Sequence, residues 1–235
     1  MSAAFFHIVG RELRATFTSA VGYIFSVIFL AFTGWLVFQN LFIASRAELR
    51  FFFELLPLTL AFVVPAVTMR VFAEELSTGS FEVLTTLPVT DWDIVLGKFV
   101  GAWGFIVLML TPTILYPLIV GQFGDLDAGP VVGGYVGVLF LSGLYCAVGI
   151  LTSALTRNQI VAVLVGWAVC SFLALIDDML VFFPGAITNV VQYVGADFHF
   201  KSIARGVIDS RDLIYFLSAI FLALFGTSLA IERRK

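Results

Sequence analysis

The chain has 235 residues, of which 60% are apolar and 12% are charged, and its formal net charge is −3. A soluble domain carries about 25% charged residues, so this composition excludes a soluble enzyme and a disordered chain. There is no excess of basic residues for contacts with nucleic-acid phosphates, and two cysteines are too few for a disulfide scaffold. We therefore expect an all-α integral membrane protein.

Residues 1–19 have the pattern of an amphipathic helix that lies at the membrane interface. Over residues 3–18, apolar side chains recur at i, i+4 spacing, and polar side chains gather on another face. The apolar set is Phe5, Val9, Leu13 and Phe17, and the polar set is His7, Arg11, Arg14 and Thr18. We expect the apolar face to enter the lipid boundary. The helix then either anchors the first span or docks a partner.

Six apolar runs follow, each close to the roughly 20 residues that a membrane helix needs. They cover residues 21–43, 51–69, 99–120, 131–151, 160–176 and 213–231. None alternates apolar and polar residues, which excludes a β-barrel. Lysine and arginine predict the orientation, because eight lie in the termini and the second and fourth loops and five lie on the other side. Both termini are therefore expected in the cytoplasm.

Prolines and glycines interrupt these runs. Prolines at positions 57, 65, 112 and 117 each permit a kink. Two glycine triplets offer small faces for close helix packing, either within one subunit or along a dimer seam. These triplets are Gly97, Gly101 and Gly104, and Gly129, Gly133 and Gly137. Charged residues lie only near the ends of the spans, which disfavours an ion-coupled carrier.

The cytoplasmic loop over residues 70–98 predicts a short helix between two spans. Ser77-Thr78-Gly79-Ser80 interrupts the helical pattern after the second span. Pro88 ends the short helix that begins near Phe81. Thr90 and Asp93 have the spacing of a capping box at the start of the next helix. Phe81, Leu84 and Leu87 share one face of the short helix. That face either docks a partner or folds back onto the membrane surface or the bundle.

The connection over residues 177–212 is unlike an ordinary loop. Asp177 and Asp178 interrupt an apolar run, which resumes and then turns at Pro184-Gly185. Two short apolar segments joined in this way predict re-entrant helices on the extracytoplasmic side. The two aspartates either form a gate or ion site, or they only end a helix at the interface. The basic residues Lys201, Arg205 and Arg211 are expected to pair with Asp209 and Asp212, or else to dock an extracytoplasmic partner.

Gly97-Lys98 does not form a phosphate-binding loop. Such a loop needs a glycine five residues earlier and a serine or threonine next, whereas Trp92 and Phe99 occupy these positions. We expect no catalytic, cofactor-binding or metal site on this chain.

Two segments carry a family resemblance. The first reads MRVFAEE over residues 69–75, STGSFEVLTTLPV over residues 77–89 and DWDIVLGK over residues 91–98. It resembles the corresponding loop of type 2 ABC-transporter permeases. The second reads FHFKSIARGVIDSRDLIYF over residues 198–216 and is similar to gliding-motility-associated permease subunits. The likeness extends over nearly the whole chain, including the six-span layout and the N-terminal helix.

The resemblance implies a single transmembrane domain over residues 1–235 that works as a half-transporter in the bacterial inner membrane. Two copies, identical or different, form the pathway, and an ABC ATPase that binds ATP and Mg²⁺ docks beneath each. The short helix becomes the coupling helix, and the extracytoplasmic connection caps the pathway. The implied docking residues are Glu74, Glu75, Ser80, Phe81, Glu82, Leu84 and Leu87, and the implied gate is Asp177, Asp178, Pro184 and Gly185.

The sequence thus predicts the permease subunit of an ABC exporter, related to gliding motility, with a possible auxiliary membrane partner. One alternative is a scaffold that transmits mechanical work from the same ATPase without transport. The other is an ATP-independent secondary transporter. The sequence does not indicate the substrate.

Overall fold

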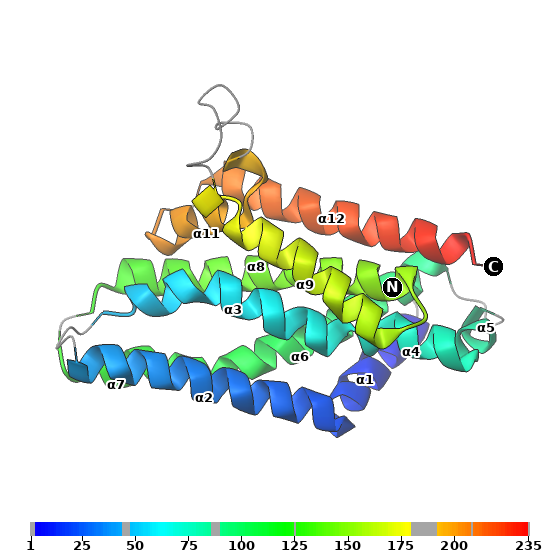
Figure 1. The fold of residues 1–235 in the computed structure, drawn as a ribbon, viewed down its shortest axis with the longest axis horizontal. Helices are drawn as coiled ribbons and strands as arrows, with labels where there is room; N and C mark the ends of the chain where they lie inside the picture. The colour runs from blue at the N-terminus through cyan, green and yellow to red at the C-terminus, as the bar shows by residue number, and fades with distance from the viewer. Residues whose placement is uncertain are drawn as a thin grey trace.

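The computed structural model describes residues 3–43, 48–85, 90–124, 126–179, 192–207 and 209–234. The regular elements in this part of the chain are helices, as the sequence predicts (Figure 1). They are α1 (Ala3–Thr18), α2 (Ala20–Ile43), α3 (Arg50–Thr68), α4 (Arg70–Thr78), α5 (Ser80–Thr85), α6 (Asp91–Leu110), the 3₁₀ helix η1 (Thr111–Ile114), α7 (Leu115–Val120), α8 (Ala128–Leu155), α9 (Gln159–Leu175), α11 (Ala196–Ala204) and α12 (Ser210–Glu232).

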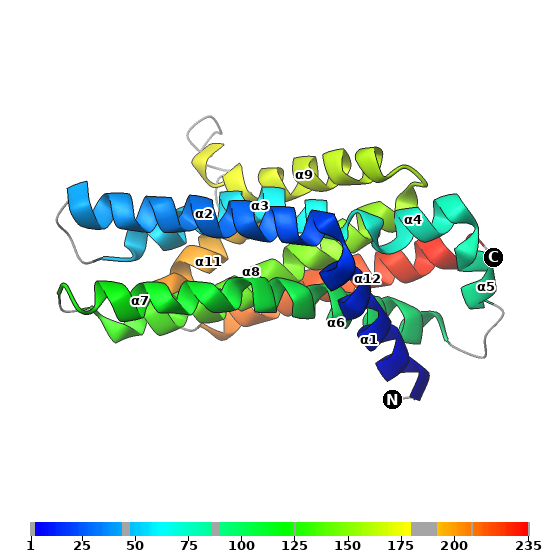
Figure 2. The same ribbon diagram turned by 90° about the horizontal axis from the view of Figure 1, so that it is seen from below.

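The long helices form an elongated antiparallel bundle with both chain ends on the same side (Figures 1 and 2). We call this side the terminal end; it holds α1, α4, α5 and the end of α12. The Arg234 guanidinium donates a hydrogen bond of 2.7 Å to the Leu155 carbonyl and so fixes the C-terminus beside the end of α8. The opposite, distal end holds α7, α11 and the starts of α3 and α8. Helix α9 therefore leads from the terminal end to the distal end, and α12 returns.

Five segments of the described chain are long and apolar enough to cross a membrane. They are Ala20–Ile43, Arg50–Thr78, Asp91–Val120, Ala128–Leu155 and Ser210–Glu232. The sixth predicted run forms α9, an apolar helix of 17 residues. A multi-pass membrane protein is therefore confirmed. The count of six spans stays a prediction.

Prolines shape the third span. Pro112 lies in η1, which separates α6 from α7. Pro117 has no backbone N–H, so the Thr113 carbonyl four residues earlier lacks its helical donor. The Tyr135 hydroxyl of α8 donates to this carbonyl at 2.6 Å. A neighbouring helix thus satisfies the group that the proline exposes.

Helix α1 matches its predicted bounds, but its surroundings differ from the prediction. Its apolar face packs on α6 of the same chain: Phe5 is buried, and the Phe17 ring meets the Phe105 ring edge-to-face with 5.0 Å between centroids. We expected this face to enter lipid. The close fit is possible because α6 presents a glycine stripe to α1. A Cβ added at Gly101 would lie only 2.7 Å from the Glu12 Cβ atom.

The second glycine triplet also packs within the chain. A Cβ at Gly133 of α8 would lie 2.3 Å from the Ile203 carbonyl oxygen, and one at Gly137 would lie 3.0 Å from the Phe200 ring. Helix α11 therefore rests directly on the start of α8. At Gly133 and Gly137, as at Gly101, the neighbours come from the same subunit, which is one of the two alternatives that the sequence left open.

We predict that Gly101→Ala destabilises the protein by about 1–3 kcal/mol, because the new methyl group overpacks the α1–α6 contact. Gly10→Ala is the matched control, since no atom lies within 4 Å of a Cβ at Gly10 and alanine favours a helix over glycine. Thermal unfolding in detergent measures both. Equal melting temperatures for the two variants would contradict the described packing of α1 on α6.

Candidate functional site

Of the residues predicted to dock an ATPase, those that the structure describes lie at the terminal end, where α1, α4, α5 and α6 meet. Helix α4 continues the direction of α3 after a turn at Met69, and α5 turns away from it at Gly79 (Figures 1 and 2). Gly79 has φ +74°, the left-handed conformation that ends many helices. The predicted break at residues 77–80 is therefore confirmed. We call α4 and α5, with the bend at Gly79 between them, the elbow.

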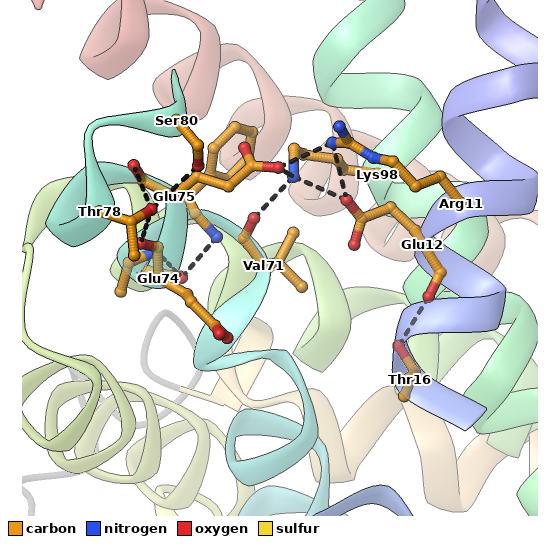
Figure 3. A network of polar contacts seen from close by, with 12 residues as sticks. Arg11, Glu12, Thr16, Val71, Glu74, Glu75, Thr78, Ser80 and Lys98 are labelled. Atoms are coloured by element: carbon orange, nitrogen blue, oxygen red, sulfur yellow. Dashed lines mark hydrogen bonds and ion pairs between the residues drawn. The ribbon is translucent and has the colours of Figure 1, made fainter. Parts of the chain in front are cut away.

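Lys98 of α6 is the centre of a buried charge network at this elbow (Figure 3). Its side chain is fully buried, and its ammonium lies 2.7 Å from Glu12 Oε1 of α1 and 2.9 Å from Glu75 Oε1 of α4. It also donates to the Val71 carbonyl at 2.7 Å, and it lies 4.8 Å from the centre of the Phe72 ring. An ammonium has three donors; here it donates hydrogen bonds to Glu12 and Val71, and Glu75 adds an ion pair.

Arg11 completes the network from the solvent side. Its Nη2 atom donates to Glu75 Oε1 at 2.7 Å and lies 3.5 Å from Glu12 Oε1. Two cations thus face two carboxylates, and the charges balance. Because these groups come from α1, α4 and α6, the network fixes the three helices relative to one another.

Glu75 and Phe81 turn inward, although the resemblance implies that both lie at an ATPase contact. Glu75 belongs to the buried network, and its Oε2 atom has no hydrogen-bond partner within the described chain. Phe81 is 4% exposed and packs edge-to-face on Phe72, with 6.3 Å between ring centroids. Phe81 therefore follows the fold-back alternative and holds α5 against α4.

Glu74, Ser80 and Glu82 lie on the outer surface of the elbow. The Glu74 carboxylate is 4.0 Å from the Arg70 guanidinium, and both side chains are about half exposed. The Ser80 hydroxyl is 3.0 Å from the Thr78 hydroxyl across Gly79. The Leu84 backbone belongs to α5, but the Leu84 side chain and all of Leu87 lie outside the described residues.

Ser153 of α8 anchors the start of α4. The Phe72 and Ala73 backbone N–H groups donate to its hydroxyl at 3.0 and 2.9 Å, and the hydroxyl donates to the Met69 carbonyl at 2.8 Å. The first N–H groups of a helix have no partners within it, so a side chain from another helix acts as the cap. The start of α6 follows the sequence prediction, because the Thr90 hydroxyl accepts from the Asp93 N–H at 3.2 Å.

Two residues of the predicted gate, Asp177 and Asp178, follow α9 directly at the distal end. Pro184 and Gly185 lie outside the described residues. The expected pairing of Lys201 is wrong: it forms an ion pair with Asp197, one helical turn away. Asp212 instead accepts a hydrogen bond of 2.7 Å from the buried ring of His199, which stacks on Tyr215.

At the distal end, burial and neighbouring charged groups shift the pKa values of Asp177, Asp197 and Lys201. Burial raises the pKa of the Asp197 carboxyl, Lys201 opposes this rise, and Asp177 and Asp178 add to it. Burial also raises the pKa of Asp177. Burial alone would lower the pKa of Lys201, but Asp197, with Asp178 and Asp177, holds it above its ordinary value. Three carboxyl groups thus share one lysine.

Comparison with known families decides the class of protein. Residues 47–195, more than half of the chain, match the family described as ABC-2 family transporter protein. The chain belongs to this family. Membership makes it a membrane subunit of a transporter and implies an ABC ATPase as partner. The curated proteins compared with this permease give no match.

From the sequence, Lys98 was considered only for a phosphate loop, and Glu12 was not considered as a partner. Lys98 is the one lysine in the apolar helix α6, whereas Glu12 lies between Arg11 and Arg14 in an amphipathic helix, where no signal marks it. Their pairing joins positions that are 86 residues apart. Local spacing does not report such a contact.

We predict that Lys98→Met destabilises the permease by about 3–5 kcal/mol, because it leaves the Glu12 and Glu75 carboxylates buried without their cation. The matched control is Arg50→Met, which breaks the solvent-exposed pair with Glu54 (2.9 Å) and should cost at most about 1 kcal/mol. Thermal unfolding of the purified proteins measures both. If Lys98→Met costs no more than Arg50→Met, the buried network does not hold the terminal end together.

Proposed function

We propose that this permease is the membrane half of an ABC exporter that works as a dimer with two ATPase subunits, which supply ATP and Mg²⁺. The observation that carries the proposal is the set of contacts around α4. Phe81 of α5 packs on Phe72 of α4, Lys98 joins α4 to α1 and α6, and Ser153 joins α4 to α8. A push on α5 would therefore pass through α4 to several membrane helices.

In this proposal α5 is the coupling helix. Nucleotide-driven closure of the ATPases would move the elbow as a rigid body, and α4 would pass the movement to α3, which it nearly continues. Glu74, Ser80 and Glu82 supply the exposed contact, and Leu84 and Leu87 stay predicted contacts. Glu75 and Phe81 act inside the elbow, where they hold its shape.

The proposed topology has six spans with both termini in the cytoplasm. The chain ends share the terminal end of the bundle, so the chain makes an even number of passes. Five passes satisfy the length criterion, and α9 is the return pass from the terminal to the distal end. Its 17 residues reach about 25 Å, at the lower limit for a membrane helix.

The bacterial inner membrane and a role related to gliding motility are part of the proposal, and residues 198–216 support the latter by their resemblance. At the distal end Asp177 and Asp178, with Pro184 and Gly185, form the proposed extracytoplasmic gate. The alternative function, a scaffold that transmits mechanical work without transport, would use the same coupling helix and the same ATPase partner. ATP-dependent flux of a substrate in vesicles distinguishes the exporter from the scaffold.

Charge reversal on the outer face of the elbow tests the docking surface. We predict that Glu74→Lys combined with Glu82→Lys reduces co-purification of the co-expressed ABC ATPase by at least about tenfold, because each change replaces an exposed carboxylate at the contact. The control is Glu48→Lys, an exposed glutamate at the distal end. If the double variant retains the ATPase as well as the control does, α5 is not the coupling helix.

Accessibility of introduced cysteines tests the topology. Glu48→Cys and Arg205→Cys lie at the distal end and should react with a membrane-impermeant maleimide in intact cells. Arg157→Cys, in the exposed turn between α8 and α9, should react only after permeabilisation. The native Cys146 and Cys170 are buried and give little background. If Arg157→Cys reacts in intact cells, the turn between α8 and α9 is not cytoplasmic. The proposed course of α9, from the cytoplasmic side to the outer side, would then be wrong.

A further inference from the structure

The distal end contains a cavity of about 950 Å³ between α3, α8, α9 and α11. Twelve of its twenty lining residues are apolar, among them Phe53, Pro57, Leu175 and Phe200, and the other eight are charged. Ligand pockets for drug-sized molecules occupy about 300–1,000 Å³ and have mostly apolar walls with a few polar groups. The cavity therefore has the size and the lining of a site for an organic molecule.

The charge in this cavity is unbalanced. Asp197 lines it and is 4% exposed; its Oδ2 atom pairs with Lys201, whereas Oδ1 has no hydrogen-bond partner within the described chain. Asp178 also lines the cavity, and Asp177 beside it has a buried Oδ1 atom without a hydrogen-bond partner in the same part of the chain. The cavity is also lined by the Arg50–Glu54 ion pair and by Glu48, Asp127 and Arg205, so five carboxylates and three cations line it and leave a formal net charge of −2.

A buried carboxylate oxygen without a donor is costly, so the site favours a positively charged donor. A bare metal ion suits it poorly, because the described residues contain no group of three or more metal-ligating side chains. An organic cation fits better, since its ammonium group donates to the carboxylate and its apolar part covers the walls. Aromatic rings such as Phe53 and Phe200 also attract cations.

We propose that the distal cavity is a binding site for amphipathic organic amines. The ammonium group meets Asp197 Oδ1, Asp178 adds negative charge at the exposed rim, and the apolar part of the ligand lies against Phe53 and Phe200. This binding needs no ATPase and does not depend on the role of α5, so its test is separate from the test of the exporter proposal.

The test is fluorescence anisotropy of rhodamine 123, a xanthene dye with amino groups and a positive charge, titrated with the full-length permease in detergent. Fluorescein, which has the same ring system and a negative charge, is the matched probe. We expect saturable binding of rhodamine 123 at micromolar protein and at least about tenfold weaker binding of fluorescein. Equal binding of both dyes would show partition into the detergent and overturn the proposal.

Three variants locate the binding. Asp197→Asn should weaken rhodamine 123 binding at least about tenfold, because it removes a charge-assisted hydrogen bond. Asp178→Asn, at an exposed position that does not threaten folding, should weaken it about threefold through lost Coulomb attraction. Asp209→Asn is the control: it caps α12 at the same end without lining the cavity, and asparagine caps equally well.

The variants also decide the outcome if one of them misfolds. If thermal melting shows that Asp197→Asn is unfolded, rhodamine 123 binding by Asp178→Asn is compared with binding by Asp209→Asn. This comparison distinguishes a site in the cavity from a general attraction of the cationic dye to a negatively charged protein. Unchanged binding in folded Asp197→Asn, or equal loss in Asp178→Asn and Asp209→Asn, would refute the amine site.

Discussion

The ammonium of Lys98 sets the constraint on which the terminal end of the bundle depends. A charge that is fully withdrawn from solvent needs oxygen partners in place of water, and here three different segments supply them: α1, the start of α4, and its end. None of these segments can move alone without leaving an oxygen or the ammonium unpaired. The buried charge, in addition to apolar packing, therefore holds α4 against α1 and α6.

The two ends of the bundle solve the problem of buried charge differently. At the terminal end Arg11 and Lys98 balance the charge of two glutamates, although Glu75 Oε2 has no donor within the described chain. At the distal end Lys201 faces three aspartates, and two of their oxygens have no donor within the described chain. The balanced network suits a part that transmits movement. The network with excess negative charge suits a part that receives a cationic ligand.

The sequence predicted the helices well, because a membrane helix can be recognised from the length of its apolar run. Glycine, proline and capping residues then indicate where a helix begins or ends. Helix α1, the break at Gly79 and the cap at Thr90 lie where their residues placed them. The sequence predicted the side-chain partners poorly. Lys98 and Phe81 took neighbours that no local pattern specifies, since their choice depends on which helices lie side by side. For the same reason the sequence did not predict that α1 packs on α6. Lys201 did pair locally, but with Asp197 one turn before it and not with the aspartates that follow it.

The separation of Glu12 from Lys98 has a consequence for biosynthesis. Proteins form from their N-terminus at about 5–20 residues per second, so Glu12 emerges several seconds before the lysine that neutralises it, 86 residues later. During that interval the Glu12 carboxylate has no lysine partner. The first helix to be made can therefore take its final place only after α6 is made, when about half of the chain is still to be synthesised.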